Sequence, residues 1–217
     1  MTDIPLEHVH VEPSEPIEGP APAVVLLHGR GSNEQDLLQL SREFPDHLHV
    51  VSLRAPDPLQ GGYTWYELDL SAGGLHKSQP HTEQFERSRE LVRESIAAAR
   101  DEYGLDAERI GLLGFSQGAI TSLSLLLEDP DDYAWVVALH GYLAEEHESV
   151  EPDGIAGKPI FVGGGSMDQI IPSFRVERAA ERLEALGADV TAQMYDAPHG
   201  VSPEELADVV SFVETHA

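Results

Sequence analysis

The sequence of 217 residues contains no cysteine and only two lysines, Lys77 and Lys158. The lack of cysteine excludes disulfide bonds, thiolate metal sites and a cysteine nucleophile. No apolar run approaches the roughly 20 residues that a membrane-spanning helix needs. The first residues, MTDIPLEHVHVEPSEP, show neither a basic flank nor an apolar segment, so no secretory signal is predicted. We therefore expect a cytoplasmic protein without membrane insertion.

Basic residues are scarce overall: 13 Lys and Arg stand against 39 Asp and Glu, a formal net charge of −26. A surface this negative repels phosphate backbones and anionic lipids, so nucleic acid is not an expected partner. The acidic residues occur along the whole chain rather than in one tail. Self-repulsion of this kind is screened by salt, which predicts a halophilic protein of a salty cytoplasm. The alternative is a protein that is acidic without being salt-adapted.

Short apolar runs alternate with amphipathic stretches of helix length. Continuous apolar runs such as AVVLL at 23–27 are typical of strands buried on both faces of a sheet. We predict strands at 6–11, 23–27, 48–53, 109–114, 134–139, 159–162 and 190–195, the first at a sheet edge. The pattern predicts an α/β fold, with a mostly parallel central sheet and helices on both faces, in a single domain over residues 1–217.

Capping and stop signals predict where the helices begin and end. We predict helices from the capping box of Ser32 and Gln35 to Phe44, from 82 to 103 before Gly104, at 117–127, from Ser173 to Leu186, and after the capping box of Ser202 and Glu205. Residues 55–81 have no clear period but are apolar enough to pack, and residues 145–152 are expected to form an acidic loop.

The strongest motif is Gly114-Phe115-Ser116-Gln117-Gly118, between a predicted buried strand and a predicted buried helix. A serine with glycine two residues to either side, in this context, is the nucleophile-elbow pattern. The turn is tight enough to strain the serine, and side chains at the two glycine positions would clash with their neighbours. Ser116 is therefore the candidate nucleophile; the alternative is a small residue that fills a tight turn.

An elbow serine needs a histidine base that follows it in the chain. Four histidines follow: His147 lies in the acidic loop, His216 is next to the last residue, and His140 ends a buried strand. His199 lies between proline and glycine, after the last strand and before the capped helix, at the edge where α/β active sites collect. We predict that His199 is the base and that His147 and His216 are solvated.

The acid that orients the base comes between the serine and the histidine in the chain. Asp168 follows the strand before last, after a glycine-rich turn. Asp153 lies in a charged loop, and Asp196 is too near His199 in the chain to fold back onto it easily. Asp168 is the candidate that holds the imidazole tautomer and stabilises the imidazolium.

Acyl transfer also needs N–H donors for the oxyanion. The elbow supplies the backbone N–H of Gln117, and the loop His28-Gly29-Arg30-Gly31 supplies that of Arg30. This loop does not continue as a phosphate-binding loop, because no Gly-Lys-Ser/Thr follows. Trp65 and Tyr63 are candidates for lining the acyl pocket, or they simply pack the long loop. No metal site is predicted. The histidine pairs His8/His10 and His47/His49 alternate as strand residues do, and neither pair has a third ligand nearby.

The segments LLHGRGSN, GGYTWYELD, GFSQGA, GSMDQIIP and GADVTAQMYDAPHGVSPEEL resemble the phospholipase/carboxylesterase family of α/β hydrolases, which includes the acyl-protein thioesterases. The resemblance runs from about residue 24 to the end. It implies an α/β-hydrolase fold with little or no lid, a triad of Ser116, Asp168 and His199, and oxyanion amides at Arg30 and Gln117. It also implies cleavage of small-molecule carboxylic esters or thioesters with short to medium acyl chains, without a cofactor.

Two residues depart from the family pattern. Arg30 stands where the family often has an apolar residue, and His140 stands where it usually has serine. We expect both to affect the substrate site, His140 as a second histidine close to it.

Other functions remain open at this stage. A dienelactone-hydrolase-like enzyme usually carries cysteine at the elbow, and a peptidase is a further enzymatic alternative. A receptor that retains the hydrolase scaffold without catalysis is the alternative from another class. The sequence does not decide the natural substrate, the preference for ester or thioester, or the oligomeric state, of which a homodimer is one option.

The net charge leads to the first testable prediction. Because salt screens repulsion among the acidic residues, we expect the melting temperature to rise between about 0.1 M and 3 M KCl. Calorimetry or circular dichroism over this range measures the effect. A melting temperature that stays constant would show that the acidity is not a salt adaptation.

Overall fold

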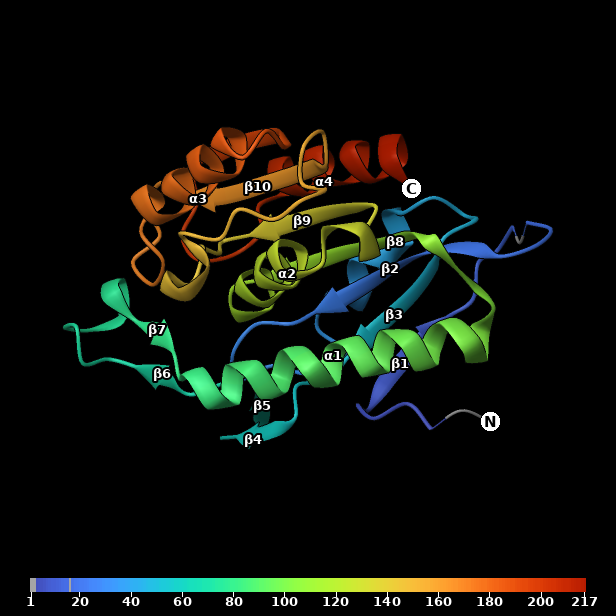
Figure 1. Cartoon of the computed structure of the whole chain (residues 1–217), viewed down its shortest axis with the longest axis horizontal. Coiled ribbons are helices and arrows are strands. Elements are labelled where there is room, and N and C mark those ends of the chain that lie inside the picture. The colour runs from blue at the N-terminus through green and yellow to red at the C-terminus, as the bar shows by residue number, and fades with distance from the viewer. Residues whose placement is uncertain (1–2, 16) are drawn as a thin grey trace.

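The computed structural model describes residues 3–15 and 17–217, and its centre is a seven-stranded sheet with the order β1-β3-β2-β8-β9-β10-β11 (Figure 1). Only β1 runs antiparallel to its neighbour, and the other six strands are parallel. The strands are β1 His8–Val11, β2 Ala21–Leu27, β3 His49–Leu53, β8 Leu105–Phe115, β9 Trp135–Leu139, β10 Pro159–Gly165 and β11 Asp189–Tyr195. The predicted α/β-hydrolase fold, with a mostly parallel sheet and its first strand at an edge, is confirmed, and the structure adds that this edge strand is antiparallel. That the chain forms a single domain stays a prediction.

The centre of the sheet is buried on both faces. All seven residues of β2 are buried, and Val25 pairs in register with Val51 of β3 and Leu112 of β8. A strand covered on both sides has no polar face, which is why β2 is continuously apolar in sequence. The carboxyl ends of these parallel strands lie at one edge of the sheet, where the loops of the site begin.

Helices cover both faces of the sheet. They are α1 Thr82–Tyr103, α2 Gln117–Glu128, α3 Ser173–Ala185 and α4 Pro203–His216. One apolar core contains side chains of α1, α2 and α3, such as Phe85, Leu123 and Val176. The second core contains Val209 and Phe212 of α4 together with Leu37 of the 3-10 helix η1 (Leu37–Glu43). In Figure 1, α1 and α2 lie in front of the sheet.

Two helix boundaries confirm the predictions from local signals. α1 ends at Tyr103, and Gly104 follows with a φ of 67°, a left-handed conformation that glycine adopts without steric cost. At the start of α4, the Ser202 side chain accepts a hydrogen bond from the Glu205 N–H, and the Glu205 side chain accepts one from the Ser202 N–H. Both terminal donors are therefore satisfied within the predicted capping box.

Two other helix starts differ from the prediction. Ser32 caps no helix; it forms an isolated β-bridge with Tyr63, and the residues after it form the 3-10 helix η1 rather than an α-helix. The Ser32 carbonyl accepts a hydrogen bond from the Tyr63 N–H at 2.7 Å, and the Ser32 N–H, which a capping box would use, donates to the Gly29 carbonyl at 3.3 Å. Ser173 is the first residue of α3, after Pro172, and makes no side-chain cap.

Residues 55–81 fold into two small hairpins without a helical period. The short elements are β4 Asp57–Leu59, β5 Gly62–Thr64, β6 Leu68–Asp69, the 3-10 helix η2 Leu75–Lys77, and β7 Gln79–Pro80. Trp65 and Tyr66, between the hairpins, are completely buried, which confirms that the segment packs. In Figure 1 the β6–β7 hairpin extends beyond the body of the sheet.

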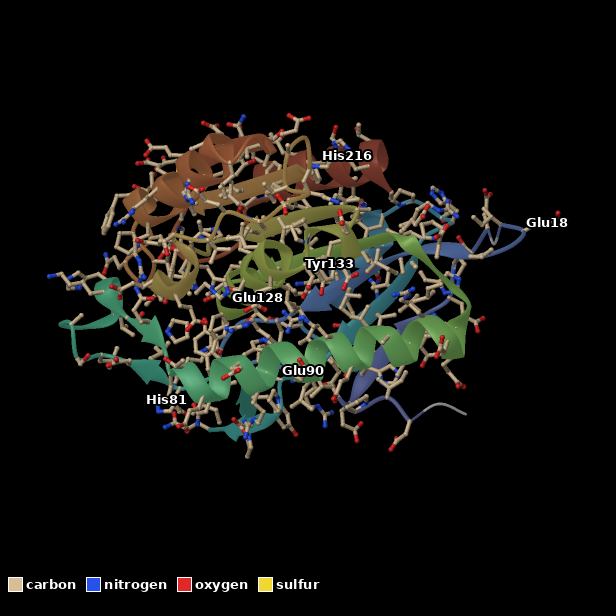
Figure 2. The ribbon with its side chains drawn as sticks, viewed as in Figure 1. Glu18, His81, Glu90, Glu128, Tyr133 and His216 are labelled. Carbon is tan, nitrogen blue, oxygen red and sulfur yellow. The ribbon has the colours of Figure 1, made fainter. Side chains whose placement is uncertain are left out.

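The expectation that His147 is solvated is wrong. Its side chain is buried, and its Nε2 lies 2.9 Å from a carboxylate oxygen of Glu128. Glu128 lies beside α1 (Figure 2) and also pairs with Arg89 at 3.0 Å and with Arg93. A predicted acidic loop is thus tied to the fold by charge-assisted hydrogen bonds, which the composition of the loop alone does not reveal.

No helix in the described part of the chain is long and apolar enough to cross a lipid bilayer.

Candidate active site

Ser116 joins β8 to α2 in a strained backbone conformation, with φ 55° and ψ −116°. A Cβ atom at Gly114 would lie 2.3 Å from the backbone of Gly118, and one at Gly118 would lie 1.9 Å from the Leu27 carbonyl oxygen. Both distances are too short for any side chain. The two flanking glycines therefore allow β8, α2 and β2 to approach closely enough for the elbow to form.

The structure brings the three candidate residues together at the carboxyl edge of the sheet. Ser116 follows β8, Asp168 follows β10, and His199 follows β11. The His199 Nε2 atom lies 3.0 Å from Ser116 Oγ, and the His199 Nδ1 atom lies 2.6 Å from Asp168 Oδ2. The other carboxylate oxygen of Asp168 accepts hydrogen bonds from the N–H groups of Ile170 and Ile171 at 2.8 and 2.9 Å. Both oxygens of the carboxylate are thus fixed.

The competing acidic residue lies apart from the base. Asp196 lies within hydrogen-bond distance of Ser166, at 3.3 Å, and its side chain is exposed. Asp196 is only three residues before His199, so the chain between them is too short to turn the Asp196 carboxylate back onto the His199 ring. Asp153 is likewise exposed in its charged loop.

His140 lies behind the triad rather than in the substrate cavity. Its side chain is completely buried, with Nδ1 2.9 Å from Asp168 Oδ2 and Nε2 3.2 Å from a Glu205 carboxylate oxygen. Because both ring nitrogens face carboxylates, the prediction of a substrate contact is corrected to one of contact with the acid. Glu205 was missed as part of this cluster, since its position in the capping box already accounts for a glutamate in the sequence.

These contacts affect the pKa values of the cluster. Burial disfavours the charged form of Asp168, but hydrogen bonds from His140 and His199 outweigh it and lower the pKa of this carboxyl. Desolvation lowers the pKa of His199; Asp168 opposes this effect and the neighbouring His140 adds to it. Desolvation also disfavours the charged form of His140, yet hydrogen bonds to Glu205 and Asp168 raise its pKa.

His140, Asp168 and His199 also form a group whose possible metal-ligand atoms lie within 4.8 Å of one another. In both histidines the Nδ1 atom already faces the same oxygen of Asp168. A cation among these atoms would replace both of these hydrogen bonds, so the geometry favours a hydrogen-bonded cluster over a metal centre.

The Gln117 side chain connects the elbow to the long loop. Its amide oxygen accepts hydrogen bonds from Thr64 Oγ1 at 2.9 Å and Trp65 N–H at 3.2 Å, and its amide nitrogen donates to the Tyr66 carbonyl at 2.8 Å. Sequence reasoning assigned a role only to the backbone of Gln117. Its side chain carries a further function, which is to hold residues 64–66 against the start of α2.

The two candidate oxyanion amides belong to Arg30 and Gln117, and both residues line the same cavity as Ser116. Gln117 is the first residue of α2, where the amide has no partner within the helix. The Arg30 side chain points to the surface and pairs with Glu67 at 3.4 Å. Any contribution of Arg30 to an oxyanion site therefore comes from its backbone.

The predicted roles of Trp65 and Tyr63 in lining the pocket are not supported. Trp65 is completely buried, and its indole N–H donates to the His28 carbonyl at 2.8 Å. Tyr63 bridges to Ser32 and carries the Arg54 guanidinium over its ring at 4.7 Å. Trp65 belongs to the apolar core and Tyr63 packs against it, and neither residue lines the cavity beside Ser116.

A cavity of about 300 Å³ opens next to Ser116 and His199. Its wall is mainly apolar, from Leu68, Leu75, Phe115, Ile120, Ile170 and Ile171. Tyr66 also lines it, and the Tyr66 hydroxyl is buried without a hydrogen-bond partner. An apolar hollow with a few convergent polar groups is the usual form of a small-molecule site.

Comparison with known proteins agrees with this geometry. The sequence profile of the phospholipase/carboxylesterase family matches residues 8–217, which is almost the whole chain. The chain belongs to the phospholipase/carboxylesterase family. Membership makes it an esterase- or thioesterase-type hydrolase.

Individual members of the phospholipase/carboxylesterase family align over most of their length. Acyl-protein thioesterase 1 of Candida albicans is 28% identical over 211 residues, which cover 88% of this chain and 90% of that protein. The putative hydrolase MhqD of Bacillus subtilis is 28% identical over 182 residues, covering 84% and 87%.

Solved structures share the fold. That of esterase PE8 has a TM-score of 0.83 at 25% identity and covers 98% of this chain and 99% of its own. The carboxylesterase of Bacillus cereus has a TM-score of 0.84 at 24% identity, with coverage of 98% and 95%.

The tight elbow leads to a prediction about stability. We expect Gly118→Ala to lower the free energy of unfolding by about 1–3 kcal/mol, because its new methyl group meets the Leu27 carbonyl. Urea unfolding at constant KCl measures it. The matched control is Gly200→Ala, whose methyl group would meet nothing within 4 Å, with an expected change within about 0.5 kcal/mol. Equal effects of the two substitutions would contradict the packing argument.

Proposed function

We propose that this protein is a serine hydrolase that cleaves carboxylic esters or thioesters of short to medium acyl chains. The observation that carries the proposal is the 3.0 Å contact between His199 Nε2 and Ser116 Oγ at the mouth of an apolar cavity. A nucleophile, a base and an orienting acid within hydrogen-bond distance of one another are what acyl transfer requires.

In the proposed acylation step, His199 takes the proton of Ser116 as the hydroxyl oxygen attacks the acyl carbon. This needs His199 in the tautomer with hydrogen on Nδ1, and the contact of that nitrogen with Asp168 at 2.6 Å favours it. Asp168 then stabilises the imidazolium that forms. Its lowered pKa supports this role, because the carboxylate keeps its negative charge.

The oxyanion is proposed to be bound by the backbone N–H groups of Arg30 and Gln117. One such donor is typically worth about 2.7–4 kcal/mol of barrier. The imidazolium of His199 then protonates the leaving alcohol or thiol, and the acyl group stays on Ser116. A water molecule, deprotonated by His199, attacks the acyl-enzyme and releases the acid.

The cavity supports the substrate class. Its volume of about 300 Å³ lies at the lower end of the range of ligand pockets, which favours acyl chains of modest length. Relatives named acyl-protein thioesterases make thioesters a substrate class to test beside oxygen esters. We also retain, as proposals, a cytoplasmic location and adaptation to salt.

The sequence alone also allows a receptor without catalysis, and membership of the phospholipase/carboxylesterase family argues against it. Nothing in the proposed triad is missing, and the strained elbow presents Ser116 to the cavity. Labelling with a fluorophosphonate probe separates the two functions, because only an activated serine reacts.

Removal of the nucleophile leads to the next prediction. With 4-nitrophenyl esters from acetate to laurate in molar KCl, we expect turnover by the wild type and loss to background in Ser116→Ala. The chain-length optimum then measures the usable length of the cavity. The matched control is Ser122→Ala on the same helix, buried but without contact to the cavity, which we expect to keep activity. A folded wild type that cleaves neither esters nor thioesters would contradict the proposal.

The pH dependence follows from the base. His199 must be neutral to accept the Ser116 proton, so kcat/KM falls as pH drops through the pKa of His199. Because burial lowers this pKa, we expect the acid limb below about pH 6.5, the usual value for histidine. A pH–rate profile of an ester from pH 4.5 to 8 tests this. A flat profile, or a limb well above pH 6.5, would contradict the assigned base.

A further inference from the structure

A second cavity, of about 440 Å³, lies beside the proposed active-site cavity. Tyr142 lines both, and η2 lies between them: Leu75 lines the active-site cavity, whereas His76 and Lys77 line the second one. The opposite wall comes from α3. Figure 1 shows α3 and the β6–β7 segment at the same end of the molecule.

The charge of this second cavity is opposite to that of the chain. Four of the 13 Lys and Arg residues line it, against two acidic residues, although acids outnumber bases threefold in the sequence. The cations are Lys77, Arg175, Arg178 and Arg182, and the acids are Glu145 and Glu148. Such a concentration of positive charge in a protein of net charge −26 attracts anions to one place.

Two of these four cations, Lys77 and Arg175, are not neutralised by the protein. The other two have acidic partners: Arg178 pairs with Glu148 at 2.7 Å, and Arg182 pairs with Glu151 at 3.7 Å. Within residues 3–15 and 17–217, Lys77 and Arg175 have no carboxylate at ion-pair distance.

Arg175 is held in place by other contacts. Its guanidinium lies 3.3 Å above the Tyr142 ring, and its Nη2 donates to the Ser78 carbonyl at 2.9 Å. Its Nη1 is buried and has no hydrogen-bond partner. A fixed guanidinium with unused hydrogen-bonding capacity is suited to a carboxylate or phosphate.

We propose that the second cavity binds an anionic group, carboxylate or phosphate, of the ester substrate. The inference rests on the proposed hydrolase function and deepens it: the substrates are esters that carry an acidic group beyond the scissile bond. Tyr142 and Ser78 connect the two cavities, since both line the active-site cavity and both contact Arg175. The acidic group reaches the second cavity from the acyl side or from the leaving-group side.

Paired substrates test the proposal on both sides. For the acyl side, 4-nitrophenyl pentanoate, heptanoate and nonanoate are compared with the mono-4-nitrophenyl esters of glutaric, pimelic and azelaic acid. For the leaving-group side, a 1-acylglycerol is compared with its 3-phosphate by fatty-acid release. In one of the two sets we expect the anionic member to have a KM about threefold to tenfold lower, the size of a few charge-assisted contacts near the surface. Measurements use the lowest KCl concentration at which the protein stays folded, because salt screens the attraction.

The variant with Lys77→Gln and Arg178→Gln removes two charges from exposed positions of the cavity. We expect it to lose the preference for anionic esters while neutral esters keep their kcat and KM. The matched control, Arg42→Gln with Arg100→Gln, removes the same charge from residues outside both cavities and keeps the preference.

Equal KM values for anionic and neutral esters in both sets would overturn the proposal. An equal loss of the preference in the control variant would overturn it as well, because the preference for anionic esters would then come from the net charge of the protein and not from the second cavity. The proposal would also be overturned if inorganic phosphate inhibited the cleavage of neutral esters but not that of anionic esters. The cavity would then bind a free anion rather than the acidic group of the substrate. Turnover of neutral esters by the wild type keeps these outcomes distinct from a failure of the hydrolase function.

A different observation, the burial of His140, carries a second inference. His140 has a φ of 52° and, with Ser116 and Gln60, is one of three non-glycine residues with positive φ in the described chain. Its two ring nitrogens face two carboxylates, Asp168 and Glu205, and carboxylates accept hydrogen bonds. Both nitrogens donate only in the imidazolium form.

We infer that His140 is a positioning residue, a buried imidazolium that competes with His199 for the Asp168 carboxylate. The titratable groups that face it are Asp168 after β10, Glu205 on α4 and His199 after β11, whose ring centre lies 5.4 Å away. The uncharged Phe115 ring also lies against it, at 5.5 Å between ring centres. A positive charge on His140 partly neutralises the Asp168 carboxylate and repels a second positive charge on His199. The pKa of His199 is therefore lowered, and the base stays neutral at lower pH.

Neutral replacements test this role. We expect His140→Asn combined with Glu205→Gln to shift the acid limb of kcat/KM upward by about one pH unit, because the neighbouring positive charge is gone. Val209→Ala, which removes buried contacts of α4, is the control: it lowers the melting temperature and leaves the limb unchanged. A folded double variant with the wild-type limb would overturn the inference.

Discussion

The site depends on one steric constraint, the close approach of β2, β8 and α2 at the elbow. No side chain fits at Gly114 or Gly118, and the Leu27 carbonyl occupies the space that a Cβ atom of Gly118 would need. This packing holds Ser116 at a positive φ that a free chain avoids. The hydroxyl is thereby fixed at the edge of the sheet, where loops from other strands bring His199 and Asp168 to it.

The Asp168 carboxylate is the second centre of organisation. It accepts hydrogen bonds from two backbone amides and faces two histidines, one at the cavity and one completely buried. The buried histidine connects this carboxylate to Glu205, which also caps α4. α4 and the proposed acid of the triad are therefore connected through one hydrogen-bonded cluster.

Charge is distributed in this molecule at two scales. Acidic residues dominate the sequence as a whole, which concerns solubility and the response to salt rather than the reaction. Within this background, arginines gather where α3 meets η2, next to an apolar cavity. This juxtaposition of an apolar and a positively charged cavity is the basis of the proposed preference for esters that carry an anionic group.

Local patterns in the sequence determined the α/β class, the places of the main strands along the chain, the end of α1, the start of α4, and the candidate residues of the proposed triad. Elbow, stop and capping signals act over a few residues, so they can be read locally. Only the tertiary structure decided what depends on partners far along the chain. Ser32 pairs with Tyr63 instead of capping a helix, Trp65 turns into the core, and His140 turns toward Asp168 and Glu205. The direction of a side chain and the partner of a buried charge are set by packing between distant segments, and no local pattern carries that information.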